Sequence, residues 1–257
     1  MFSTQRKRPN QLITIPISHF CEKARWALEW CGIHYVEKPH LQGFHFLSAY
    51  RFAKTDSVPI LVCKDGVLKD STEILKWADA NALETRKLFP SDPALRRDIE
   101  AFEDFLDEGL GVSTRLWMYT YLFDELPLII RYTAKHGVPR HERMLLPLVF
   151  PILRKGLEGL LDMTERSRDE SQRDVDAVFN QVAQKLSDGR NYLFGDQFTA
   201  ADLTFAALAA AVLIPENYGA PLPQLSELPA EMAEQIQKWR AHPAGQFAAR
   251  LYRDQRQ

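Results

Sequence analysis

The residues best placed for chemistry lie near the N-terminus, where an apolar run gives way to a helical pattern. The run from Leu12 to Ile15 predicts a buried strand, and residues 19–31 predict a helix that Gly32 closes. Ser18 would stand at the N-terminus of that helix, on the C-terminal edge of the strand. Unpaired N–H groups and the positive end of the helix dipole favour an anion there, such as a thiolate or a carboxylate. Serine also caps helices without any other function, so a purely structural interpretation stays open.

Two further helix starts carry a capping pattern. Residues 70–73 (Asp-Ser-Thr-Glu) place an N-cap aspartate three residues before a glutamate, which is the pattern of a capping box. The same pattern recurs at residues 199–202 (Thr-Ala-Ala-Asp), between two apolar residues. We interpret Asp202 as a folding signal for a buried helix and not as a catalytic residue.

Composition excludes several classes of function. The chain has 257 residues, of which 46% are apolar, and a formal net charge of −2, so no basic field favours nucleic acid. The one basic cluster, residues 6–8, lies in a polar tail. The seven histidines and three cysteines show no metal-ligand spacing, and no glycine-rich phosphate motif is present. We therefore expect neither a metal nor a nucleotide.

The cysteines and apolar runs also indicate a compartment. Cys21, Cys31 and Cys63 form neither a CxxC pair nor an even disulfide framework, which is typical of a reducing environment. No signal peptide precedes them, and the longest apolar run, residues 203–214, is too short to span a bilayer. We expect a cytoplasmic protein with no membrane partner.

Two compositions divide the chain. After a flexible tail over residues 1–10, strand-like and helix-like stretches alternate over residues 11–81, and Asp65-Gly66 marks a hairpin turn. The order strand, helix, strand, helix, hairpin, helix predicts a mixed sheet that contains a parallel pair. Residues 82–93 form a proline-containing linker, and residues 94–257 are predicted to be all helical. The fold class is therefore an α/β domain followed by an all-α domain.

Four features, in this order, resemble the cytosolic glutathione transferases. They are Ser18 followed by residues 23–25 (Lys-Ala-Arg), the pair Val58-Pro59, the pair Asp70-Ser71, and the segment 195–203 (Gly-Asp-Gln-Phe-Thr-Ala-Ala-Asp-Leu). The first of them is similar to the active-site turn of the serine-type zeta and theta classes. The resemblance implies that residues 11–81 form a thioredoxin-like, glutathione-binding domain and that residues 94–257 hold a hydrophobic co-substrate pocket.

The resemblance also implies that two helix starts bind one molecule of glutathione. The peptide bond before Pro59 would be cis and would turn the backbone of Val58 toward the cysteinyl part of the ligand, whereas the structural alternative is a strand-starting proline. The N–H groups and hydroxyl of Ser71 would hold the γ-glutamyl carboxylate, and Asp70 would accept from its amino group. His45 would meet the glycyl carboxylate.

The helical domain would supply the pocket for an apolar co-substrate. Aromatic residues are dense between residues 112 and 154, and such density is typical of a core. In the resembled fold, however, the first long helices of this domain wall a hydrophobic pocket beside the thiol. We assign Ser113, Arg115 and Tyr119 to that pocket. The apolar candidates for either role are Trp117, Met118, Tyr119, Tyr121, Phe123, Tyr132 and Phe150.

The predicted chemistry is activation of the glutathione thiol by Ser18. Lowering the pKa of a thiol from about 8.5 by two units requires about 2.7 kcal/mol of preference for the anion. A hydrogen bond from a neutral hydroxyl to an ionised group contributes roughly 1.5 to 3 kcal/mol, and a helix N-terminus adds about 0.3 to 1. The two together suffice for attack on a small hydrophobic electrophile. His19, beside Ser18, is expected to be solvated.

Three other functions stay open. Cys21 stands at the second position of what is a Cys-x-x-Cys pair in glutaredoxins, with Ser18 at the first. Because the first position lacks a thiol, disulfide reductase activity of that type is not favoured, and we expect Cys21 to be buried and inert. A reactive Cys21 would instead indicate a thiol transferase resembling the omega class. A glutathione-dependent isomerase or dehalogenase would use the same site, and the fold also serves non-catalytic binding and scaffold proteins. The resemblance implies a homodimer.

Overall fold

The computed structural model describes residues 9–122, 125–134, 136–161 and 163–256. Its N-terminal part alternates strands and helices, as the sequence predicts. These elements are β1 (Asn10–Thr14), α1 (His19–Trp30), β2 (Tyr35–Pro39), α2 (His45–Ala53), β3 (Ile60–Cys63), β4 (Gly66–Leu68) and α3 (Ser71–Asn81). Asn10, which we placed in the tail, belongs to the first strand.

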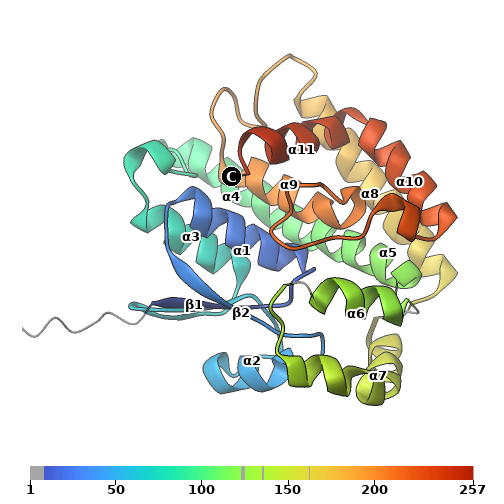
Figure 1. Ribbon diagram of the computed structural model, residues 1–257. Coiled ribbons are helices and arrows are strands. Elements are labelled where there is room, and N and C mark those ends of the chain that lie inside the picture. Colours follow the sequence, from blue (N-terminus) through green and yellow to red (C-terminus); the bar gives the residue numbers. More distant parts are fainter. Residues whose placement is uncertain (1–8, 123–124, 135, 162, 257) are drawn as a thin grey trace, which may run out of the picture.

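The four strands form one mixed sheet in the order β2-β1-β3-β4. β1 pairs parallel with β2 and antiparallel with β3, and β3 pairs antiparallel with β4. Successive side chains of a strand point to opposite faces, so Leu12 and Leu61 pack toward α1 and α3, whereas Ile13 and Ile60 pack on Ala49 of α2. The sheet therefore has helices on both faces (Figure 1).

Helices make up the rest of the described chain. After a short 3-10 turn (Glu84–Arg86), α4 (Pro93–Leu106) runs through a π-helical turn (Asp107–Gly111) into α5 (Val112–Leu122). The other helices are α6 (Leu126–Ala134), α7 (Arg140–Leu161), α8 (Glu165–Lys185), α9 (Ala200–Leu213), the 3-10 turn Leu225–Glu227, α10 (Ala230–Ala241) and α11 (Pro243–Asp254). The predicted fold class, a thioredoxin-like domain followed by a helical one, is confirmed. α3 ends at Asn81 and α4 begins at Pro93, and the exact division into domains stays a prediction.

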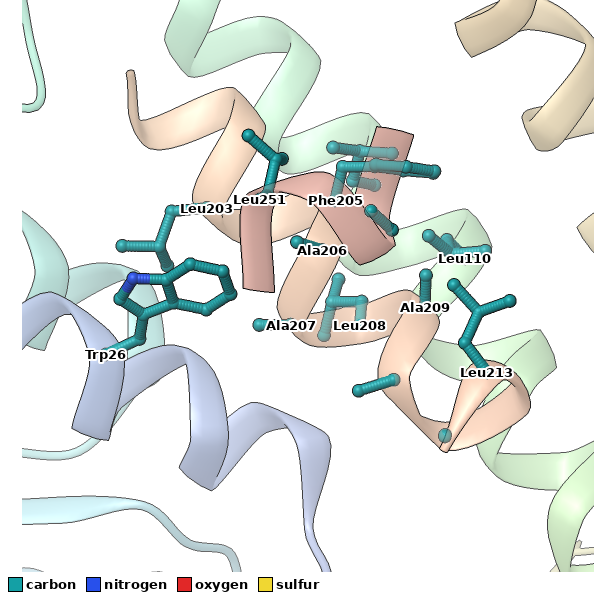
Figure 2. Close-up of a cluster of buried hydrophobic side chains, with 14 of the residues drawn as sticks. Trp26, Leu110, Leu203, Phe205, Ala206, Ala207, Leu208, Ala209, Leu213 and Leu251 are labelled. Atoms are coloured by element: carbon teal, nitrogen blue, oxygen red, sulfur yellow. The ribbon is translucent and has the colours of Figure 1, made fainter. Parts of the chain in front are cut away.

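The core is organised around α9, every residue of which is buried. Figure 2 shows its leucine, alanine and phenylalanine side chains packed between Trp26 of α1, Leu110 of the π turn and Leu251 of α11. An all-round apolar helix of this kind must lie inside the molecule. α9 therefore joins the two domains through one continuous core.

α7 lies beside α2, and α6 lies next to α7 (Figure 1). Leu41, after β2, is buried in a small cluster with Val138 and Leu146 of this pair. Glu142 of α7 accepts from His40 Nδ1 at 2.6 Å and from the backbone N–H of Leu41 at 2.9 Å. None of the described helices is both long and apolar enough to cross a membrane.

Candidate active site

The strand register brings the three predicted N-terminal motifs to one end of the sheet. β1 ends at Thr14, just before Ser18, and Ile13 pairs with Ile60, so Pro59 lies at the same end. Leu61 pairs with Leu68, so the segment that leads from β4 into Asp70-Ser71 also ends there. Ser18 thus meets two motifs that follow it by 40 to 53 residues in the sequence, because the antiparallel pairings reverse the chain.

Ser18 is the N-cap of α1. Its backbone is extended (φ −71°, ψ 121°), and its Oγ accepts from the N–H of Cys21 at 3.4 Å. Its own N–H donates to the carbonyl of Ile15 at 3.1 Å, which closes the turn between β1 and α1. The side chain is partly exposed. Because the hydroxyl oxygen acts as the acceptor in the cap, the hydroxyl proton can be donated to a neighbouring atom.

Arg25 holds the turn that presents Ser18. Its Nη2 donates to the carbonyl oxygens of Ile15 and Pro16 at 3.4 and 3.1 Å, and its Nε donates to Glu37 at 2.8 Å. Burial alone would raise the pKa of Glu37, but the hydrogen bond from His136 and the charge of Arg25 hold it at about 2. Arg25 therefore forms an ion pair with Glu37 and at the same time binds the backbone of the turn.

The start of α3 is a second polar N-terminus. Asp70 Oδ1 accepts from the N–H groups of Thr72 and Glu73 at 2.8 and 3.4 Å. Glu73 accepts from the N–H of Lys69, so the capping box closes one residue earlier than its pattern predicts. Ser71 is buried, and its Oγ has no hydrogen-bond partner among the described residues. An unsatisfied buried hydroxyl is costly, so this group is ready to bind a ligand atom.

The peptide bond between Val58 and Pro59 is cis, as the resemblance implied. Pro59 is buried at the first position before β3, and Val58 is partly buried against the α2 face of the sheet. The contact of the Val58 backbone with a ligand stays a prediction.

A buried ionic cluster ties the two helix starts together. Lys23 of α1 donates to Glu103 and, at 2.6 Å, to Asp107, both on the segment from α4 into the π turn. It also donates to Thr72 Oγ1, next to Ser71, at 3.0 Å. Burial raises the pKa of Asp107, and the positive charge of Lys23 acts in the opposite direction. The cluster fixes α1, α3 and α4 relative to one another, and it was missed in the sequence because its partners are about 80 residues apart.

His19 is buried, and the expectation that it is solvated is wrong. Its Nε2 donates to the carbonyl of Gly111 in the π turn at 2.8 Å, which joins the start of α1 to the helical domain. Burial lowers its pKa to about 4. The imidazole beside Ser18 is therefore neutral near pH 7 and serves as a structural donor.

Cys21 is fully buried. Its Sγ accepts from the N–H of Ile15 at 3.5 Å, and burial raises the pKa of its thiol, although Arg25 and Ser18 act in the opposite direction. A reactive cysteine needs exposure and a lowered pKa. The environment of Cys21 thus provides neither.

His45 lies at the start of α2 with both ring nitrogens engaged. Nδ1 accepts from the N–H of Gly43 at 3.1 Å, and Nε2 donates to the carbonyl of Asp56 at 3.1 Å. Burial lowers its pKa, so the ring is neutral. These bonds hold the loop between α2 and β3. Because both ring nitrogens are already bonded, the geometry does not favour a contact of His45 with a glycyl carboxylate, and that contact stays a prediction.

The three residues assigned to the co-substrate pocket are divided by the structure. Ser113 donates to Asp174 of α8 at 3.2 Å, away from the end of the sheet. Arg115 and Tyr119 lie nearer to the start of α1. Burial lowers the pKa of His19, and the charge of Arg115 lowers it further. Burial also raises the pKa of Tyr119, on which the charges of Arg115 and Cys21 act as well. Phe123 lies outside the described residues.

An apolar cavity of about 50 Å³ lies beside the turn that carries Ser18. Ile17 lines it from that turn, and helical-domain residues such as Met118, Leu128, Tyr132 and Met232 line the rest. Tyr218, also in the lining, donates to the carbonyl of Ile17 at 3.1 Å. Ser113, Arg115 and Tyr119 are not among the lining residues, so of the predicted candidates Met118 and Tyr132 are the ones at this cavity. Trp117 instead is core, packed edge-on against Trp239.

No group of three or more histidine, cysteine, aspartate or glutamate residues within the described part of the chain could hold a metal ion. The three cysteines are all unpaired.

A thioredoxin-like domain with a cis-proline before its third strand, followed by a helical domain, is the architecture of a glutathione transferase-type protein. Residues 12–86 match the N-terminal domain of glutathione S-transferases, and residues 139–242 match their C-terminal domain. The chain therefore belongs to the glutathione S-transferase family. No curated protein matches it.

Several solved structures share the fold. A glutathione S-transferase from Sinorhizobium meliloti 1021 is 16% identical with a TM-score of 0.60, covering 96% of this chain and 99% of its own. The β-etherase LigF from Sphingobium sp. strain SYK-6 is 18% identical with a TM-score of 0.58, over 94% and 98%. A theta-class enzyme from Xanthomonas axonopodis pv. citri, solved with glutathione bound, is 17% identical with a TM-score of 0.56, also over 94% and 98%.

Proposed function

We propose that this protein is a serine-type glutathione transferase, in which the hydroxyl of Ser18 donates a hydrogen bond to the thiolate of glutathione. The observation that carries the proposal is the register of the sheet, which gathers Ser18, Val58-Pro59 and Asp70-Ser71 at one end. Solved relatives of the same fold, including the theta-class enzyme, bind glutathione.

The start of α3 would bind the γ-glutamyl end of the ligand. Its carboxylate would accept from the N–H groups at the helix start and from the unpartnered hydroxyl of Ser71, while Asp70 would accept from the ammonium group. The backbone of Val58 would pair with the cysteinyl residue. The sulfur would then lie toward Ser18, at the other helix start.

The hydroxyl of Ser18 lowers the pKa of the bound thiol because it bonds more strongly to the anion than to the neutral group. Together with the N-terminal dipole of α1, this supplies about 2 to 4 kcal/mol, enough to make the thiolate the dominant form near pH 7. The thiolate attacks an electrophilic carbon of the second substrate and forms a C–S bond, while the leaving group or an activated double bond takes the electron pair. The proton lost from the thiol goes to solvent.

We place an apolar group of the electrophile in the cavity at Ile17, because a volume of about 50 Å³ is too small for the whole second substrate. Its lining is almost wholly apolar, and it adjoins the turn that carries Ser18. Holding glutathione and the electrophile next to each other at that turn would supply much of the rate enhancement. We further propose that the protein is a homodimer, as the family resemblance implies.

Replacing Ser18 with alanine tests the proposal. We expect the pKa of bound glutathione to rise by about 1 to 2 units, and turnover near pH 7 to fall roughly ten- to a hundredfold, because one hydrogen bond to an ionised group is lost. The thiolate absorbance of the complex measures the first effect, and conjugation of a chromogenic electrophile measures the second. S18T keeps the hydroxyl and should restore most of both.

The matched control is S187A, which removes an exposed serine hydroxyl at the C-terminal end of α8. It should change neither quantity. An unchanged thiol pKa and unchanged turnover in S18A would rule out the role of Ser18. Loss of activity on alkylation of Cys21 in an intact fold would favour a thiol transferase, and failure of the folded protein to bind glutathione would favour a scaffold.

A further inference from the structure

The outward faces of α2 and α7 are unusually apolar for surface helices. On α7, Leu148 and Ile152 are 73% and 75% exposed, and on α2, Leu47 and Tyr50 are 79% and 64% exposed. Met144, Leu145 and Phe46 are exposed beside them. Contiguous apolar side chains of this kind on a folded protein mark a surface that meets another apolar phase.

The two faces form one surface. Gly43, just before α2, is so close to α7 that a Cβ atom there would lie 2.4 Å from a methyl group of Leu153. Leu41 and Leu146 are buried together between the two segments. In Figure 1, α2 and α7 lie side by side along the lower edge, beneath the sheet and α6. We call this the α2–α7 surface.

The charge of the α2–α7 surface differs in sign from that of the whole chain. Residues 45–54 and 140–161, which span α2 and α7, hold six lysine and arginine residues and two acidic ones, whereas the whole chain has 32 basic and 34 acidic ones. One of the acidic residues, Glu142, is buried and paired with His40. The exposed basic residues are Arg51, Lys54, Arg140, Arg154 and Lys155, whereas the Nε of Arg143 is buried.

We propose that the α2–α7 surface binds the face of an anionic phospholipid membrane. Exposed apolar side chains flanked by lysine and arginine are the pattern of helices that lie in the plane of the interface, with their apolar residues in the acyl boundary and their charges on the headgroups. No described helix can span the bilayer, so the contact is peripheral. This departs from the expectation, drawn from composition, that the chain has no membrane partner.

A second copy of the chain fits this surface less well. Two copies related by a twofold axis would place the same patch on both sides, and the exposed basic residues of each copy would face the basic surface of the other. An anionic lipid surface instead neutralises them while it buries the same apolar side chains. The inference is independent of the proposed enzymatic function.

The test is co-sedimentation of the full chain with vesicles of phosphatidylcholine, alone or mixed with phosphatidylserine. We expect binding to the mixed vesicles, at least tenfold weaker binding to phosphatidylcholine alone, and release by high salt, which screens the charges. I152E should lower partition into the mixed vesicles roughly tenfold or more, because a carboxylate replaces an apolar anchor. Replacing Lys54 and Lys155 with glutamine should lower it by a similar factor at low salt.

The matched control is L83E, because Leu83 is also 75% exposed but lies in the segment between α3 and α4. It should bind vesicles like the unaltered chain, and both glutamate variants should keep the far-UV circular dichroism spectrum of the folded protein. Absence of binding to anionic vesicles, equal binding to the two vesicle types, or equal binding by I152E overturns the proposal. A dimer that I152E converts to a monomer, with no vesicle binding by either form, would assign the surface to a second copy.

Discussion

Three helix starts in this molecule have a polar N-cap residue, namely Ser18 at α1, Asp70 at α3 and Thr199 at α9, and they differ in what their polar groups touch. At α9, Asp202 accepts from the N–H groups of Leu193 and Thr199, each at 2.8 Å, and from the hydroxyl of Thr199. All of these groups are buried, and each has its partner within the chain. At α1 and α3, by contrast, Ser18 is partly exposed and the hydroxyl of Ser71 has no partner among the described residues.

The difference separates a folding signal from a site. A capping motif whose donors and acceptors are all satisfied inside the chain has nothing left to offer a ligand. A helix start with an unused hydroxyl at the end of a sheet retains that capacity. The starts of α3 and α9 both match the capping-box pattern in the sequence, so only their hydrogen-bond partners distinguish these two.

The largest expected effect is on the stability of the α9 start. D202A leaves the buried N–H groups of Leu193 and Thr199 without an acceptor, so we expect a loss of roughly 3 to 5 kcal/mol in the free energy of unfolding. Urea denaturation measures it. The control D196A removes an exposed aspartate nearby and should change stability by less than about 0.5 kcal/mol. A similar small change in D202A would mean that the α9 cap is not structural.

The next effect concerns the buried histidine at the start of α1. The pKa of His19 is about 4 in the folded chain and near 6.5 when unfolded, so between these values the unfolded chain binds more protons. Stability should therefore be fully present above pH 6.5 and fall by about 3 kcal/mol as pH falls toward 4.

H19Q keeps a donor for the carbonyl of Gly111 but does not titrate. Between pH 7 and pH 4, the unfolding free energy of H19Q should fall less than that of the unaltered chain, because the part of the decrease that is due to His19 is absent. An identical pH profile in H19Q and the unaltered chain would show that His19 is not held neutral by burial.

The smallest effect on stability, and the sharpest contrast with Asp202, is expected at Ser71. Because its hydroxyl has no partner within the described residues, S71A loses no hydrogen bond and should not lower the free energy of unfolding. Its Kd for glutathione should rise roughly tenfold or more, because a hydrogen bond to a carboxylate is lost. Isothermal titration measures the Kd.

S171A is the control, since it removes a buried serine hydroxyl of α8 far from the end of the sheet. It should leave the Kd unchanged. Loss of stability without loss of affinity in S71A would place Ser71 in the same structural class as the α9 cap.

Local signals in the sequence predicted most of the N-terminal fold. The strand at residues 12–15, the Asp65-Gly66 hairpin and the helix that begins at Ser71 were recognised because turn and capping preferences act within a few residues. The family resemblance added the cis bond before Pro59, which composition alone does not indicate.

What the sequence could not supply were contacts between distant segments. Lys23 pairs with Glu103 and Asp107 across about 80 residues, and no local pattern predicts such a partner. The burial of His19 depends on the carbonyl of Gly111, which only the packed helical domain brings near. The face of α5 was equally undetermined; the hydroxyl of Ser113 bonds to α8, and its place in the pocket stays a prediction.

The most direct test of the central claim is a crystal structure of the protein with glutathione bound. The account predicts that the sulfur lies within hydrogen-bond distance of Ser18 Oγ and that the γ-glutamyl carboxylate meets the N–H groups at the start of α3 and the hydroxyl of Ser71. Glutathione bound away from these two helix starts, or its sulfur held by any residue other than Ser18, would contradict it.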